Sequence, residues 1–155
     1  MYFNDIKSSF LNEGIITSEL KSKFDDIKTI GSSYTSLTND QLERDLFTCY
    51  AYGNRNNIAK LVELTWSRSF SDFDALASDN FKRLSSSLIS SITSKNFVLT
   101  NLDHARQSKL GEFLVTVSED LEREPKTLRV FISKGTELES GLHLRKLFLY
   151  PELYA

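Results

Sequence analysis

The stretch Phe73–Ile92, FDALASDNFKRLSSSLISSI, carries the strongest structural signal in the sequence. Residues three and four positions apart share one face of an α-helix, and Ser71 and Asp74 before its first full turn have the spacing of a capping box. The stretch therefore predicts a long helix with one apolar face. That face is formed by Phe73, Leu76, Ala77, Phe81, Leu84, Leu88 and Ile92.

Segments on either side of this stretch repeat the same period over shorter lengths. A glycine follows three of these segments, at Gly14, Gly31 and Gly53, where a helix commonly ends. We therefore expect a mainly α protein, a single-domain bundle of six or seven helices over residues 1–155. The further segments with helical apolar spacing are Phe3–Phe10, Ile16–Ile27, Leu42–Tyr50, Ile58–Trp66 and Leu102–Leu121.

The pattern changes after Pro125. Residues 127–133, TLRVFIS, are short, alternating and β-branched, which predicts one extended segment. Thr136 and Glu139 have capping-box spacing and favour a last helix, although residues 142–149, LHLRKLFL, would alternate equally well as a strand.

Composition indicates an ordinary globular protein without a metal or a cofactor. The chain has 155 residues, 40% of them hydrophobic, a net charge of −2, two histidines and one cysteine, Cys49. One cysteine excludes an intrachain disulfide and a cysteine-built zinc site, and favours the reducing cytoplasm. Because eighteen apolar residues never follow one another, we expect no membrane-spanning helix.

Catalytic motifs are scarce. Neither a glycine-rich phosphate loop nor a G-x-S-x-G elbow occurs. Glu137, Glu139 and His143 form the best acid–base set, since Glu139 and His143 would share a helix face and the carboxylate could orient the imidazole. A transferase or nuclease using these three residues is the first alternative function.

Basic residues surround the predicted extended segment: Arg123, Lys126, Arg129 and Lys134. Clustered cations of this kind can contact phosphates of nucleic acid. Four acidic residues between positions 119 and 124 oppose their charge. A nucleic-acid-associated regulator is therefore the second alternative.

Two aromatic and polar segments favour binding to another protein. The segment Ala51–Asn57, AYGNRNN, contains Tyr52, Asn54 and Arg55, and tyrosine and arginine are common interface anchors. The chain also ends on an apolar stretch that is either buried or a docking face, with Phe148, Tyr150, Leu153 and Tyr154 as its candidate partner-binding residues. We therefore expect a small inhibitor, immunity or adaptor protein that acts by covering a partner's surface.

Overall fold

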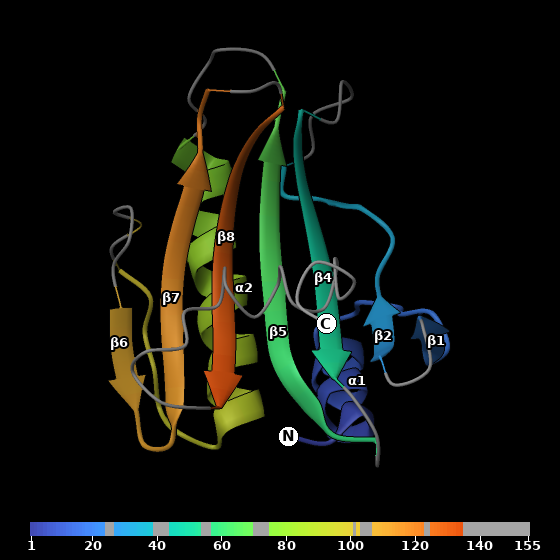
Figure 1. Ribbon diagram of the computed structural model, residues 1–155. Coiled ribbons are helices and arrows are strands. Elements are labelled where there is room, and N and C mark those ends of the chain that lie inside the picture. Colours follow the sequence, from blue (N-terminus) through green and yellow to red (C-terminus); the bar gives the residue numbers. More distant parts are fainter. Residues whose placement is uncertain are drawn as a thin grey trace.

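A computed structural model describes residues 1–23, 27–38, 44–53, 57–69, 75–100, 102, 107–122 and 125–134. These residues form an antiparallel β-sheet with two helices against one face (Figure 1). The helices are α1 (Phe3–Asn12) and α2 (Ala75–Thr93), and the strands are β1 (Lys21–Lys23), β2 (Ile27–Gly31), β3 (Thr35–Ser36), β4 (Asp45–Gly53), β5 (Ala59–Arg68), β6 (Gln107–Leu110), β7 (Phe113–Asp120) and β8 (Lys126–Lys134).

The strand order is β1-β2-β4-β5-β8-β7-β6, and β3 pairs separately with β4. On both sides of the sheet the paired strands are close in sequence, whereas at its centre β5 pairs with β8, and α2, β6 and β7 lie between these two strands in the chain. Figure 1 shows both helices behind the sheet, α2 behind β7 and β8 and α1 behind β4. Neither α1 nor α2, the helices in the described part of the chain, is long and apolar enough to span a bilayer.

The expected mainly α bundle of six or seven helices is wrong. The helices expected around residues 3–10 and 73–92 are confirmed by α1 and α2, and the extended segment at 127–133 by β8. The segments expected as helices at 16–27, 42–50, 58–66 and 102–121 instead contribute, where the structure describes them, to β1, β2, β4, β5, β6 and β7. The last helix expected after Thr136 lies outside the described residues. Both faces of β4 and β5 are largely buried, so apolar residues fall close together and imitate a helical period.

The core lies between the sheet and the helices. The ring of Phe81 on α2 contacts the rings of Phe47 and Trp66, with centroid distances of 5.8 and 5.7 Å. The indole Nε1 of Trp66 donates to Asp45 Oδ1 at 2.8 Å, so this buried polar atom has a partner. The aromatic contacts thus fix α2 against the middle of the sheet.

The serines of α2 attach the chain that follows the helix. Ser86 Oγ accepts from Leu99 N at 2.8 Å, and Ser90 Oγ accepts from Phe97 N at 3.0 Å. Ser91 also shares a 2.7 Å hydrogen bond with Ser9 of α1. These hydroxyls therefore satisfy backbone groups and join the two helices, a role that their helical spacing alone does not reveal.

Cys49 lies in the core with a side chain that is fully buried. Burial raises the pKa of its thiol, an effect larger than the opposing effect of the hydrogen bond with Ser32. The folded protein therefore keeps a proton that the unfolded chain loses above the ordinary thiol pKa of 9.0. A protonated, inaccessible thiol is a poor nucleophile.

We expect the free energy of unfolding to fall as pH rises above 9.0, with a contribution from Cys49 of up to about 1.4 kcal/mol per pH unit. Urea unfolding between pH 8 and 10 measures this slope. The variant Cys49→Ala should show a shallower fall, because the other titrating groups are unchanged. Equal slopes in the two proteins would contradict the burial of the thiol.

Candidate functional site

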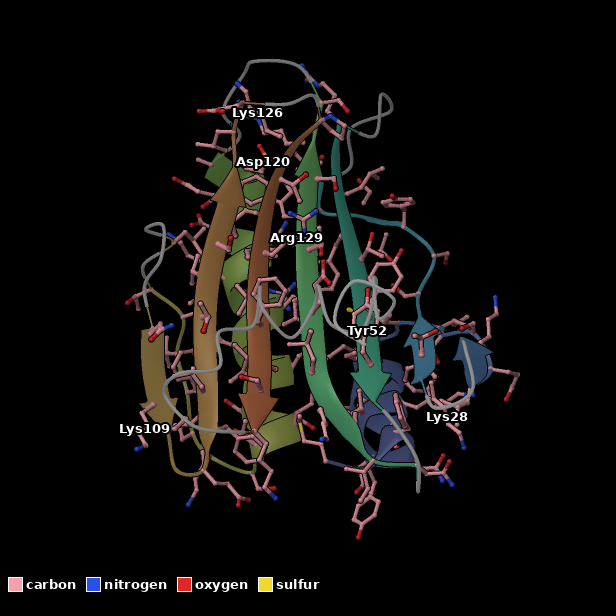
Figure 2. All side chains as sticks on the ribbon, viewed as in Figure 1. Lys28, Tyr52, Lys109, Asp120, Lys126 and Arg129 are labelled. Carbon is pink, nitrogen blue, oxygen red and sulfur yellow. The ribbon has the colours of Figure 1, made fainter. Side chains whose placement is uncertain are left out.

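The face of the sheet opposite the helices contains a cavity of about 330 Å³, here called the tyrosine cavity. Figure 2 shows Tyr52 and Arg129 on this face, with α1 and α2 behind the sheet. Strands β4, β5 and β8 provide most of its walls, and the link between β2 and β3 provides the rest. The cavity is lined by Tyr34, Thr48, Tyr50, Tyr52, Glu63, Thr65, Ser67 and Arg129.

Strand register places these residues together. Tyr50 pairs with Glu63 across β4 and β5, and Thr65 pairs with Arg129 across β5 and β8. Since successive side chains on a strand point to opposite faces, Tyr50 and Tyr52 project away from the core that Cys49 joins. Three strands in fixed register therefore present one polar and aromatic surface.

A buried ion pair lies at the floor of the tyrosine cavity. Arg129 Nε donates to Glu63 Oε1 at 3.0 Å, and Thr65 Oγ1 donates to the same oxygen at 3.1 Å. Glu63 is only 2% exposed, whereas the Arg129 side chain is 23% exposed. The two charges compensate each other, so the floor offers hydrogen-bonding groups without a net charge.

Thr48 provides a polar group that the fold leaves unsatisfied. Its Oγ1 is buried and has no hydrogen-bond partner among the described residues. Burying a hydroxyl without a partner costs about 1–3 kcal/mol, so such an atom in a cavity wall is a candidate ligand contact.

The tyrosines are held at different depths. The rings of Tyr50 and Tyr52 stack with centroids 6.1 Å apart, while Tyr34 is 63% exposed. Gly31 faces the Tyr50 ring so closely that a Cβ there would lie 2.8 Å from two ring carbons. The absence of a side chain at Gly31 therefore allows the Tyr50 ring to lie over β2.

The structure brings two of the residues singled out from the sequence into this cavity, Tyr52 and Arg129. Alternation along β8 places Arg129 on the opposite face from Lys126 and Lys134, and Lys134 pairs with Glu112 at 3.3 Å. The other predicted site residues lie outside the described ranges: Asn54, Arg55, Arg123, Glu137, Glu139, His143, Phe148, Tyr150, Leu153 and Tyr154.

The other lining residues are not predicted from the sequence: Tyr34, Thr48, Tyr50, Glu63, Thr65 and Ser67. The signal for Thr48, Tyr50 and Glu63 is present in the alternation of TCYAY and VELTW, but only once both segments are read as paired strands, and no such pattern marks Tyr34. Within the described ranges, no group of three histidine, cysteine or acidic side chains could hold a metal ion.

Comparison of the chain with protein-family models, curated proteins and solved structures finds no match. The geometry of the site itself therefore has to support any functional proposal.

Proposed function

We propose that this chain is a binding protein that receives a side chain of a partner protein in the tyrosine cavity and covers part of the partner's surface. The observation that supports this proposal is the set of tyrosine rings around a cavity built on paired strands. Interface energy concentrates in a few aromatic and arginine residues that form well-packed pockets. An inhibitor, immunity protein or adaptor would act in this way.

The chemistry of the cavity indicates what kind of side chain fits. Tyr50 and Tyr52 supply apolar ring surface, and Thr48 supplies a hydroxyl that lacks a partner within the described structure. The Glu63–Arg129 pair leaves the floor neutral overall. A partner side chain with an apolar body and an uncharged polar end, such as tyrosine or glutamine, matches this arrangement.

Binding explains the floor better than acid–base catalysis does. Glu63 Oε1 already accepts two hydrogen bonds, from Arg129 and Thr65, and the carboxylate is buried beside a cation. A general base needs to reach a substrate proton directly or through one water. We therefore assign the ion pair to shaping the cavity.

We expect Tyr34→Ala to weaken the partner complex by roughly 10- to 100-fold, because truncating a hot-spot aromatic costs about 2 kcal/mol or more. Tagged wild-type and variant chains are incubated with a lysate of the source cells, and the retained partner is then titrated. Tyr2→Ala is the matched control, since Tyr2 is similarly exposed, at 59%, but does not line the cavity.

Thr48→Val, tested in the same assay, distinguishes an effect on partner affinity from an effect on the stability of the fold. Valine removes the unpaired hydroxyl while keeping the shape, so stability should stay equal or rise while the affinity falls. If Tyr34→Ala and Thr48→Val bind as tightly as the Tyr2→Ala control, the tyrosine cavity is not the partner site.

A further inference from the structure

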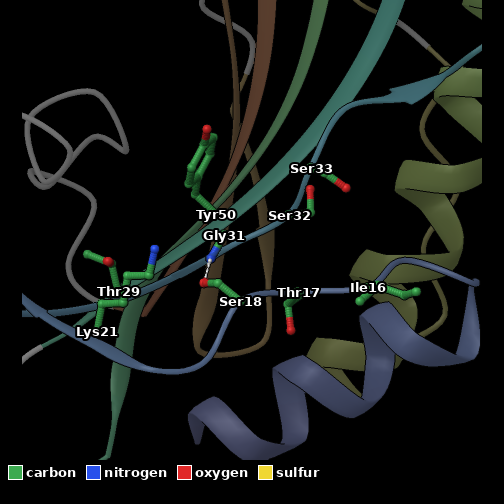
Figure 3. Close-up of a pocket in the computed structure, with 9 residues that line it drawn as sticks. All are labelled: Ile16, Thr17, Ser18, Lys21, Thr29, Gly31, Ser32, Ser33 and Tyr50. Carbon is green, nitrogen blue, oxygen red and sulfur yellow. Dashed lines mark hydrogen bonds between the residues drawn. The ribbon is translucent and has the colours of Figure 1, made fainter.

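A second cavity, of about 450 Å³, lies beside the first and is here called the hydroxyl cavity. Its walls come from the segment after α1 and from the end of β2, with the Tyr50 ring on one side (Figure 3). Tyr50 therefore lines both cavities. The volume is within the range of about 300–1,000 Å³ that is usual for small-molecule sites.

Backbone pairing makes the hydroxyl cavity a built feature of the fold. Ser18 N donates to Gly31 O at 2.7 Å, and Thr17 forms an isolated antiparallel bridge with Ser32. Ser32 N in turn donates to Cys49 O at 2.9 Å. The segment after α1 is thus tied to β2, and β2 is tied to the buried strand β4.

The lining of this cavity is rich in hydroxyl groups. Thr17 Oγ1 is buried and has no hydrogen-bond partner within the part of the chain that the structure describes. A hydroxyl group can donate one hydrogen bond as well as accept, so a cluster of them can surround an oxyanion. The hydroxyl-bearing residues are Thr17, Ser18, Thr29, Ser32, Ser33 and Tyr50.

Lys21 gives the hydroxyl cavity its charge. Among the described residues of the lining, Lys21 is the charged one, and Figure 3 shows its ammonium group directed toward the space between Ser18 and Tyr50. The acidic neighbour in sequence, Glu19, forms an ion pair with Lys7 at 3.5 Å. The lining therefore favours a negatively charged ligand.

We infer that the hydroxyl cavity binds a phosphate group, as the free ion or as a small phosphate ester. A phosphate offers several acceptor oxygens in a tetrahedral arrangement, which suits one ammonium group and hydroxyls on several sides. The Lys21 ammonium would pair with one oxygen, and hydroxyl groups of the lining would donate to others. The Tyr50 ring would then contact the body of an ester. A planar carboxylate has two acceptor oxygens and would therefore make fewer contacts with the ammonium and hydroxyl groups of the cavity.

The test is a titration of the full chain with inorganic phosphate and with ribose 5-phosphate, followed by amide NMR shifts. We expect saturable shifts around Thr17, Lys21 and Ser32, with acetate much weaker. Lys21→Gln should weaken phosphate binding roughly tenfold. Lys28→Gln is the control. It also removes one positive charge, but from a β2 residue outside the lining, so the affinity for phosphate should change little.

Two results would overturn the inference: no saturable shifts with either phosphate probe, or an equal loss in Lys28→Gln and Lys21→Gln. Tighter binding of ribose 5-phosphate than of inorganic phosphate identifies an ester as the ligand, and the reverse order identifies the free ion. The measurement needs no partner protein, so its failure would leave the proposed function of the tyrosine cavity untouched.

Discussion

Replacing Arg129 with alanine is expected to lower the free energy of unfolding by about 3 kcal/mol. The reason is Glu63, whose carboxylate is 2% exposed and would lose the hydrogen bond and the positive charge that Arg129 provides. Urea unfolding followed by the fluorescence of Trp66, the single tryptophan, measures the loss. Arg83→Ala on α2 removes an exposed arginine and should cost less than about 0.5 kcal/mol.

A double variant shows how much of this loss in unfolding free energy comes from removing the positive charge beside the Glu63 carboxylate. Replacing both residues with methionine, Glu63→Met and Arg129→Met, removes the charges together and keeps most of the volume. Buried ion pairs replaced in this way often leave stability nearly unchanged. If the double variant were as unstable as Arg129→Ala, lost packing rather than the lost pairing of Glu63 with Arg129 would explain the effect.

The second large effect is expected at Gly53, where alanine should destabilise the fold by about 3 kcal/mol. A Cβ at Gly53 would lie 2.1 Å from Ile58 O and 2.9 Å from Ala59 Cα, both backbone atoms that cannot rotate away. The pairing of β4 with β5 also shifts register between Tyr52 and Gly53. The clash would therefore disturb the sheet next to the tyrosine cavity.

Gly14→Ala is the control for this substitution. Gly14 has a φ of +76° and nothing within 4 Å of the added Cβ, so only the left-handed backbone opposes the change. That cost is about 1 kcal/mol. Similar losses for the two variants in urea unfolding would mean that Ile58 and Ala59 do not crowd Gly53.

The sequence predicted the helices and one strand, but not the sheet. In α1 and α2 the buried apolar residues lie on one side, so the helical period is clear; the β-branched alternation of β8 predicts an extended segment. In β4 and β5 the second face also carries buried side chains, among them Tyr52 and Leu61. Burial on both faces hides the two-residue period that would have identified them.

The candidate site was predictable only in fragments. The sequence predicts Tyr52 as a partner-binding residue, and Tyr52 lines the tyrosine cavity. It predicts Arg129 as a phosphate contact, whereas Arg129 pairs with Glu63. Glu63 and Arg129 are 66 positions apart in the chain. Their meeting depends on the pairing of β5 with β8, and local sequence patterns contain no information about which strands pair.

The pairing of β5 with β8 has a consequence for how the protein is made. During synthesis, β4 and β5 leave the ribosome long before β8, so one edge of β5 has no neighbour until residues 126–134 emerge. An uncovered strand edge beside apolar residues such as Leu64 invites pairing with other chains. The nascent polypeptide therefore passes through an aggregation-prone stage that ends only when its last described strand closes the gap.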